Sequence, residues 1–248
     1  MRSSPMSAPK RFFTDSINYP EESETELYGE EFVHAKTVLR ITEGSEITLL
    51  DNAGNEYSAI VTSVGKSRLS AHITGVNRGD REPETPVYLL IGALKGDKTE
   101  LVVQKATELG VSRIGVFSSR YSSAYMNDNK LERLNKVARE ATKQCYRSVA
   151  PEVSYFDSFE SALASAKDFE NKLFFCEFTT SSEADIGSIS GSTALVVGSE
   201  GGFCEEEFAL AREKYGFKGI TLGKRILRAE TAAVAVCAVT AFALGELK

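Results

Sequence analysis

The sequence predicts an α/β protein, in which a mostly parallel sheet covered by helices on both faces follows a smaller β-rich part. After about residue 85, short apolar runs alternate with helical patterns of ten or more residues, which is typical of a parallel sheet. Before that point, runs of β-branched residues are separated by turn signals. A polar stretch with two prolines, NRGDREPETP (77–86), lies between them. We therefore predict two domains, residues 1–80 and residues 81–248.

The β-rich part is expected to contain one helix and three strands. The helix covers GEEFVHAKTVLR (29–40), because its apolar residues share one face. These residues are Phe32, Ala35, Val38 and Leu39. The strands are SEITLLD (45–51), EYSAIVTSV (56–64) and RLSAHITGV (68–76). The first two flank a hairpin signal at residues 52–55, and residues 65–67 turn the chain into the third.

The second part is expected to contain six strands and five helices in near-regular alternation. The predicted strands cover residues 87–94, 113–119, 152–156, 172–178, 193–199 and 219–223. The predicted helices cover residues 98–110, 128–147, 158–169, 205–216 and 230–247. Gly110 is the expected end of the first of these helices, since glycine is favoured after a helix C-terminus.

The composition predicts a protein of the cytoplasm. Hydrophobic residues make up 42% and charged residues 26% of the 248 residues, which is typical of globular domains. No apolar run reaches the length of about eighteen residues that a membrane helix needs. The first ten residues, MRSSPMSAPK, lack the apolar core of a secretory signal.

The cysteines and histidines predict neither a metal site nor a disulfide framework. The four cysteines are widely spaced and form no CxxC pair. The two histidines leave little material for a metal centre or a Ser-His-Asp relay. The residues are Cys145, Cys176, Cys204, Cys237, His34 and His72. We therefore expect free thiols and a chemistry that needs no metal.

The net charge of −6 argues against a protein that coats nucleic acid non-specifically. One predicted helix nevertheless carries a basic stripe, since five cations between residues 130 and 147 share one face. They are Arg133, Lys136, Arg139, Lys143 and Arg147. Two interpretations stay open: a solvated helix face, and a platform for an RNA backbone, where each phosphate contact adds salt-dependent affinity.

Two loops follow predicted strands at the place where open α/β sheets bind ligands, beyond the carboxyl ends of the strands. TALVV (193–197) leads into GSEGG (198–202), and GITL (219–222) leads into GKRILR (223–228). The glycines of the first loop do not form the GxGxxG signature of a dinucleotide site. We therefore predict one pocket between the two loops, for a ligand other than a phosphate group.

The side chains of these loops indicate the kind of ligand. Glu200 repels phosphate and suits a positively charged ligand, although a carboxylate at this place also favours the dipole of the next helix. Both interpretations stay open. Arg228 stands among apolar residues and therefore needs a carboxylate, phosphate or carbonyl partner. Leu222, Ile226 and Leu227 provide the flat apolar walls that an adenine ring requires.

With these motifs assembled, the chain resembles the 16S ribosomal RNA uridine-N3 methyltransferases (RsmE-like), a branch of the SPOUT class of RNA methyltransferases. The resemblance runs nearly from end to end. The matching motifs are KRFF (10–13), HAKTVLR (34–40), LKGDKTELVVQKATELGV (94–111), EATKQCYRSVAPEV (140–153), VVGSEGGF (196–203) and LGKRILRAETA (222–232). Ser199 departs from the family pattern, which usually has proline there.

The resemblance implies a fold, a cofactor and an assembly. Residues 81–248 would form a SPOUT methyltransferase domain with a mostly parallel sheet and a trefoil knot, after a small PUA-like β-barrel that helps to hold RNA. S-adenosyl-L-methionine would be the cofactor, and no metal or membrane would take part. Carried over by motif, the residues that would hold the cofactor are Gly198, Glu200, Gly201, Gly202, Leu222, Gly223, Ile226, Leu227 and Arg228. The active form would be a homodimer, and the apolar final helix would lie either in its interface or inside its own domain.

The implied reaction is methyl transfer to N3 of a specific uridine in 16S ribosomal RNA, free or in the assembled small subunit. Uracil N3 carries a proton, so the site needs a base, or a cation that stabilises the uracil anion. Arg228 is the first candidate for this cation and Arg11 the second, while Glu200 or Glu230 would take the proton. The residues expected to contact RNA are Lys10, Arg11, Arg40, Arg139, Lys143 and Arg147.

Three other functions stay open. One is a SPOUT enzyme that acts on another RNA, such as transfer RNA. A second is an RNA-binding protein that has lost catalysis, for which Ser199 is the only hint. A third is a small-molecule enzyme with a nucleotide cofactor, which the missing dinucleotide signature disfavours.

Overall fold

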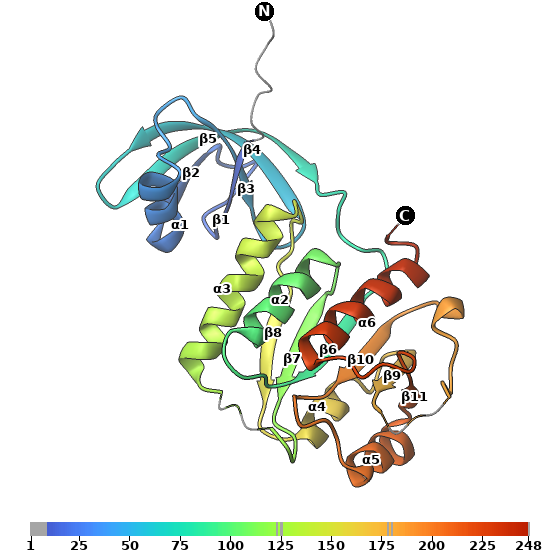
Figure 1. The fold of residues 1–248 in the computed structure, drawn as a ribbon. Helices are drawn as coiled ribbons and strands as arrows, with labels where there is room; N and C mark the ends of the chain where they lie inside the picture. Colours follow the sequence, from blue (N-terminus) through green and yellow to red (C-terminus); the bar gives the residue numbers. More distant parts are fainter. Residues whose placement is uncertain (1–8, 123, 125, 178, 180, 248) are drawn as a thin grey trace, which may run out of the picture. The chain divides into compact units, whose positions relative to one another are not determined.

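The computed structural model describes residues 9–122, 124, 126–177, 179 and 181–247 (Figure 1). Contacts between these residues divide the chain into two compact units. The first unit contains the described residues through Glu82 and also Tyr146–Val149, while the second contains Pro83–Cys145 and the chain from Ala150 onward. The predicted division between residues 80 and 81 placed Tyr146–Val149 in the second domain, whereas the structure places these residues in the first unit.

Two expectations fall on residues that the structure does not describe. The absence of a secretory signal depends mainly on residues 1–8, and the strand expected over residues 172–178 ends on Phe178; both lie outside the described residues. In the described part of the chain, no helix is both long and apolar enough to span a membrane.

The described residues of the first unit form a five-stranded sheet, with β1 (Lys10–Phe13), β2 (Glu24–Tyr28), β3 (Glu46–Leu50), β4 (Asn55–Val64) and β5 (Arg68–Arg78). The strand order is β1-β3-β4-β5-β2, and only the β1–β3 pair is parallel (Figure 1). The predicted hairpin at residues 52–55 is confirmed, and Asn52 and Gly54 take positive φ angles of 58° and 95° in it. The predicted turn at residues 65–67 is also confirmed, since it joins the antiparallel strands β4 and β5. The sequence pattern did not reveal β1 and β2, because each of these short strands contains only two apolar residues, in KRFF and ETELY.

The predicted helix at residues 29–40 is interrupted. It consists of α1 (Gly29–Val33) and a π-helical turn, η1 (His34–Val38), in which the N–H of Leu39 donates to the carbonyl of His34. This wider turn rotates the following residues. Phe32 is buried as predicted, but Val38 is 67% exposed, so the four apolar residues do not share one buried face.

The second unit contains a six-stranded sheet in which all neighbouring strands run parallel. Its strands, in sheet order, are β11 (Lys218–Ile220), β9 (Asn171–Phe175), β10 (Thr193–Val197), β6 (Val87–Gly92), β7 (Arg113–Phe117) and β8 (Glu152–Phe156). The helices are α2 (Lys98–Glu108), α3 (Asp128–Gln144), α4 (Phe159–Ser165), α5 (Glu205–Tyr215) and α6 (Ala229–Ala243), with a 3₁₀ turn, η2, at Ile186–Ser188. The predicted alternation of strands and helices is confirmed.

Helices cover both faces of this sheet, because successive strand residues point to opposite sides. Leu89 and Ile91 of β6 belong to a core cluster that includes buried residues of α2, α3 and α6. Tyr88 and Leu90 of the same strand belong to a second cluster with buried residues of α4 and α5. Strands buried on both faces explain why the sequence shows continuous apolar runs here.

The helix expected to reach residue 147 ends three residues earlier. α3 ends at Gln144, and Tyr146 takes a positive φ of 66°, which no helix accommodates. Arg147 therefore does not extend the basic stripe of α3. Its side chain is only 5% exposed and forms an ion pair with Glu82 inside the first unit.

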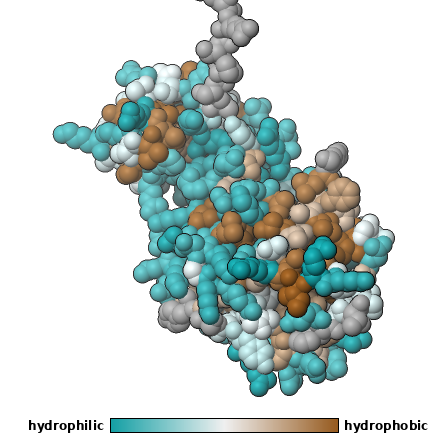
Figure 2. Space-filling model, in the orientation of Figure 1, coloured by the Kyte–Doolittle hydropathy of each residue, from teal (hydrophilic) through white to brown (hydrophobic). Residues whose placement is uncertain are grey.

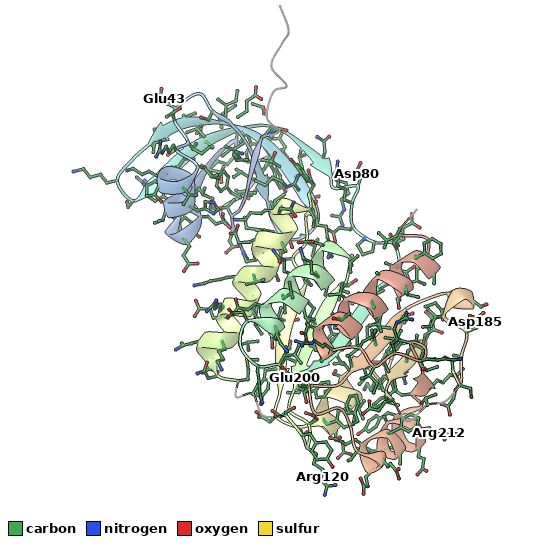
Figure 3. All side chains as sticks on the ribbon, in the orientation of Figure 1. Glu43, Asp80, Arg120, Asp185, Glu200 and Arg212 are labelled. Carbon is green, nitrogen blue, oxygen red and sulfur yellow. The ribbon has the colours of Figure 1, made fainter. Side chains whose placement is uncertain are left out.

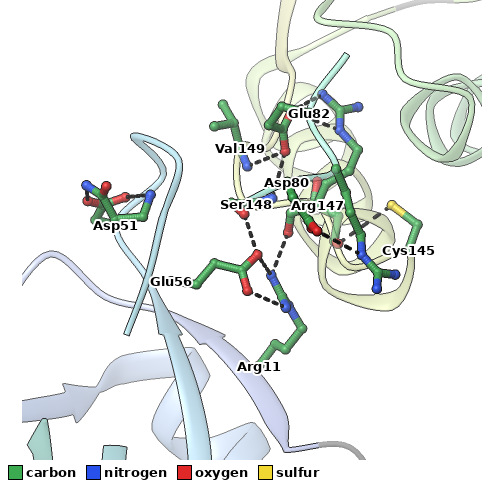
Figure 4. Close-up of polar contacts among 12 residues, drawn as sticks. Arg11, Asp51, Glu56, Asp80, Glu82, Cys145, Arg147, Ser148 and Val149 are labelled. Atoms are coloured by element: carbon green, nitrogen blue, oxygen red, sulfur yellow. Dashed lines mark hydrogen bonds and ion pairs between the residues drawn. The ribbon is translucent and has the colours of Figure 1, made fainter. Parts of the chain in front are cut away.

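A buried polar network holds Tyr146–Val149 in the first unit (Figure 4). The guanidinium of Arg11 donates to both carboxylate oxygens of Glu56, at 3.1 and 2.7 Å, and to the carbonyl of Arg147 at 3.1 Å. The Ser148 hydroxyl donates to Glu56 at 2.6 Å. The carboxylate of Glu82 accepts from the backbone N–H groups of Ser148 and Val149, at 2.7 and 3.0 Å. These bonds satisfy groups that burial would otherwise leave unpaired.

We expect this network to make the protein sensitive to acid. Burial raises the pKa of Glu56, but the hydrogen bonds from Arg11 and Ser148 and the charge of Arg11 outweigh burial and hold that pKa below its ordinary value of 4.5. A carboxyl group with a lowered folded pKa stabilises the fold above its unfolded value, and this contribution is lost as the pH falls through the folded value. Urea unfolding below pH 4.5 should show stability falling with pH, and more weakly so in Glu56→Gln. Equal slopes in the two proteins would contradict this role of Glu56.

Candidate functional site

Three loops meet at the carboxyl end of the sheet in the second unit. The loops after β10 and β11 are the two predicted from the sequence. In the sheet, β9 lies between β10 and β11, so the loop after β9 lies between theirs. Cys176, Glu177 and Thr179 of this third loop line the same space. These residues could not be predicted from the sequence, because the position of β9 in the sheet does not follow from its position in the chain.

Two adjoining cavities occupy this end of the sheet. The first, of about 470 Å³, is lined by Ile220, Leu222, Gly223, Ile226 and Leu227, among others. The second, of about 490 Å³, is lined by charged residues and by the glycine-rich loop, including Lys98, Gly198, Glu200, Gly201, Gly202, Arg228 and Glu230. Both share Phe175, Glu177, Ile226, Leu227 and Ala232. The structure thus brings together all nine residues predicted to hold a cofactor, whose roles stay predictions.

The glycine-rich loop is a tight turn. The N–H of Gly202 donates to the carbonyl of Ser199 at 3.0 Å, and Gly202 takes a positive φ of 67°, which favours glycine. Gly201 packs closely, since a Cβ atom there would lie 2.5 Å from Cβ of Tyr121. The backbone therefore forms the cavity wall without side chains that would fill the cavity.

Glu200 is tied to the beginning of α2. Its Oε1 accepts from the backbone N–H of Lys95 at 3.1 Å and lies 3.4 Å from Nζ of Lys98. Figure 3 labels Glu200 in the second unit. Burial raises the pKa of Glu200, but hydrogen bonds from the backbone of Lys95 and Glu200 and from Lys98 outweigh burial and lower it. Glu200 is therefore an ionised carboxylate at neutral pH.

Several polar groups at the second cavity have no partner among the described residues. The exposed side chain of Arg228 forms no hydrogen bond or ion pair there. The buried oxygens Ser199 Oγ and Glu230 Oε2 likewise have none. Unpaired polar atoms in a cavity wall are costly unless a ligand or water pairs with them, so this wall suits a ligand with both donors and acceptors.

The residues predicted to contact RNA fall into two groups. Lys10 and Arg40 are exposed, and Arg139 is partly exposed. Arg11, Lys143 and Arg147 have side chains only 8%, 7% and 5% exposed, and each is paired with a glutamate, at 2.7, 2.6 and 2.9 Å respectively. The burial of this second group, and of Arg11 as the second catalytic candidate, favours a structural role, because a buried paired cation has no free charge for a phosphate or a base.

In the part of the chain that the structure describes, no group of three or more His, Cys, Asp or Glu residues lies close enough together to hold a metal ion. The cysteines described there are free thiols, of which Cys204 and Cys237 are buried.

Two family models match this chain. One describes an RNA methyltransferase domain and matches residues 81–241, which is more than half of the chain. The other describes an RNA methyltransferase PUA domain and matches residues 27–74. The PUA match falls within the first, β-rich unit, and the methyltransferase match covers most of the second unit.

Curated relatives match over most of their length. A ribosomal RNA small subunit methyltransferase E of Bacillus subtilis is 35% identical over 83% of this chain and 85% of its own length. One of Mesomycoplasma hyopneumoniae is 34% identical over 90% of this chain and 95% of its own length.

Solved structures share the fold. A methyltransferase of Legionella pneumophila, solved with its bound cofactor S-adenosylmethionine, has a TM-score of 0.86 and 27% identity over 95% of this chain and 98% of that one. A ribosomal RNA small subunit methyltransferase E of Neisseria gonorrhoeae, also bound to S-adenosylmethionine, has a TM-score of 0.83 and 28% identity over the same shares of both chains.

Proposed function

Because this chain belongs to the ribosomal RNA small subunit methyltransferase E family of RNA methyltransferases, we propose that it transfers a methyl group from S-adenosylmethionine to N3 of one uridine in 16S ribosomal RNA. The family relationship supports the reaction class and the ribosomal substrate. The observation that carries the proposal is the pair of cavities where Arg228, Glu200 and the glycine-rich loop meet. We further propose that the protein acts in the cytoplasm, where ribosomal subunits are assembled.

The residues of the two cavities fit this cofactor. The first cavity offers apolar walls from Leu222, Ile226 and Leu227 that suit an adenine ring. The second offers the backbone of the glycine-rich loop, the unpaired hydroxyl of Ser199 and the ionised carboxylate of Glu200. A negative charge at this wall suits a cofactor with a sulfonium and an ammonium group. When bound, the cofactor supplies an activated methyl group.

The chain must bind the uracil, orient it and remove its N3 proton. Positioning supplies much of the rate, since an in-line displacement needs the reacting atoms aligned. Arg228 carries a guanidinium without a protein partner among the described residues, and we assign to it the stabilisation of negative charge on the uracil oxygens. Glu200 is a poor proton acceptor because its pKa is lowered. We therefore assign to Glu200 the binding of the cofactor.

We propose that three cations contact the RNA backbone: Lys10 and Arg40, which are exposed, in the first unit, and Arg139, which is partly exposed, in the second. Each such contact contributes a sequence-independent, salt-dependent part of the affinity. Arg11, Lys143 and Arg147 are occupied by glutamates, and we assign structural roles to them. The target base must also leave its stack, because N3 is enclosed in a Watson–Crick pair.

The proposed function is tested with labelled S-adenosylmethionine and small ribosomal subunits from cells that lack the gene. The expected result is label at N3 of a single uridine of 16S ribosomal RNA, located by nuclease digestion and mass spectrometry. Label in transfer RNA alone would replace the ribosomal substrate with another RNA. Cofactor binding without transfer to any cellular RNA would favour a protein that has lost catalysis.

We also propose that the protein forms a homodimer through α6 and its neighbour α2. α6 buries Val236 and Cys237 in its own unit but leaves Val239 and Phe242 exposed, at 44% and 69%. Leu101 of α2 is also exposed, at 43%, and Figure 2 shows hydrophobic residues gathered over α6. Apolar side chains gathered in one exposed patch are typical of a protein interface.

Replacing Phe242 with aspartate is therefore expected to shift the protein from dimer to monomer, because a charge in an apolar interface loses its hydration without a partner. Sedimentation velocity at micromolar concentration measures the shift. Val38→Asp is the matched control, since it places the same charge at a 67% exposed apolar residue of the first unit. A wild-type monomer, or a Phe242→Asp dimer, would show that this face is not the interface.

A further inference from the structure

One cation connects three elements at the wall of the second cavity. Nζ of Lys98, in the first turn of α2, lies 3.4 Å from Oε1 of Glu200 and 3.3 Å from Oε1 of Glu230. Glu200 belongs to the loop after β10 and Glu230 to the first turn of α6. The Lys98 side chain is 34% exposed, and those of Glu200 and Glu230 are 27% and 14% exposed. Lys98 therefore fixes the positions of both carboxylates relative to the glycine-rich loop.

The carboxylates of Glu200 and Glu230 differ in the hydrogen bonds that their oxygens accept. Oε1 of Glu200 accepts from the backbone of Lys95 and from Lys98, and these bonds lower its pKa. Glu230 is bound only through Oε1, and its Oε2 is buried without any hydrogen-bond partner among the described residues. A buried carboxylate oxygen without a donor is an open acceptor. Glu230, which carries this oxygen, lines the second cavity.

We propose that Glu230 accepts the N3 proton of the target uracil and that Lys98 is the residue that positions it, an inference that rests on the proposed function. The N3–H bond breaks, its electron pair stays on the uracil ring, and a lone pair of Oε2 forms the new O–H bond. Glu230 later returns this proton to water. The ring anion is then the nucleophile, and its charge on O2 and O4 lies within the field of Arg228, two residues before Glu230 in the chain.

Several features favour Glu230 over the other acidic groups at this wall. Glu200 accepts two hydrogen bonds at Oε1, and Glu177 is exposed. Among the described residues, neither has a buried oxygen without a hydrogen-bond partner. Lys98 and Arg228 are the cations that line the second cavity with Glu230, and Arg228 makes no ion pair among the described residues. Of these two cations, Lys98 is the one that contacts Glu230.

The test compares Glu230→Gln with wild type in single-turnover methyl transfer and, separately, in the affinity for S-adenosylmethionine measured by calorimetry. A positioned general base contributes about 100- to 10,000-fold, so we expect the transfer rate to fall at least 100-fold. The cofactor affinity should stay within a factor of about three, because glutamine keeps the shape of the side chain. Glu205→Gln is the matched control, since it removes an exposed glutamate from the first turn of α5 and should change neither quantity.

A second substrate separates proton removal from structural damage. Small subunits reconstituted with 5-fluorouridine RNA carry a more acidic N3, because fluorine withdraws electrons from the ring. Such a substrate depends less on a base, so the deficit of Glu230→Gln should shrink at least tenfold on it. For the positioning role, Lys98→Arg should retain more transfer than Lys98→Met.

Three results would overturn the inference. They are an unchanged transfer rate in Glu230→Gln, a deficit of the same size on both RNAs, and a loss of cofactor affinity as large as the loss of rate. The last result would assign Glu230 to the cofactor. Wild-type protein that places no methyl group at N3 would instead refute the proposed function, and this inference with it.

Discussion

Replacing Arg228 with alanine is expected to lower methyl transfer to the small subunit by about 100- to 1,000-fold, the usual effect of removing one donor that stabilises an anionic transition state. Arg228 lines the second cavity, and in the described part of the chain its guanidinium has no protein partner. Its removal therefore breaks no ion pair of the fold and should leave the unfolding free energy nearly unchanged. Single-turnover rates and urea unfolding measure the two effects separately.

Arg212→Ala is the matched control for Arg228→Ala. Arg212 lies on α5, its side chain is 59% exposed, and it pairs with Glu183 at 3.2 Å, away from both cavities. We expect full activity in this variant. An Arg228→Ala protein that methylates at the wild-type rate would remove Arg228 from the chemistry, while leaving the family of the protein unaffected.

Replacing Glu82 with alanine is expected to destabilise the first unit by about 3 kcal/mol, the lower end of the cost of removing one partner from a buried ion pair. The carboxylate of Glu82 accepts from Nε and Nη2 of Arg147, at 3.1 and 2.9 Å, and from the backbone of Ser148 and Val149. Without it, an Arg147 side chain that is only 5% exposed loses its ion pair with Glu82, and two backbone donors lose this acceptor. Urea unfolding at neutral pH measures the loss.

Glu26→Ala is the control for Glu82→Ala. Glu26 pairs with Arg68 at 3.2 Å, but the two side chains are 42% and 64% exposed, and exposed pairs contribute less than about 1 kcal/mol. Similar losses in the two variants would mean that the buried network around Tyr146–Val149 is no stronger than a surface ion pair.

Much of the second unit could be predicted from the sequence because its signals are local. Each strand of the parallel sheet is a continuous apolar run, and each helix shows its own spacing of apolar residues. The signals were weaker in the first unit. The four residues of β1 are too few for a pattern, and the π-helical turn at His34–Val38 changes which side chains face the core. The end of α3 was also missed, because the residues after Gln144 leave the helix for contacts with distant parts of the first unit.

Two loops of the candidate site were predicted, because residues close together in the chain indicate them. The glycine-rich loop and the segment from Gly223 to Arg228 each follow a strand, and ligands bind beyond the carboxyl ends of parallel strands. The loop after β9 carries no such signal, because Cys176, Glu177 and Thr179 are ordinary residues after an ordinary strand. Only the insertion of β9 between β10 and β11 brings them to the cavities.

The sequence by itself determined the fold class, the order of the elements in the second unit and the two loops that line the cavities, since these follow from the spacing of residues near one another in the chain. The tertiary structure decided which charges are free. Arg11 and Arg147 pair with Glu56 and Glu82, while Arg228 has no partner among the described residues. Whether a charge is paired depends on contacts between residues far apart in the chain, and periodicity carries no information about such contacts.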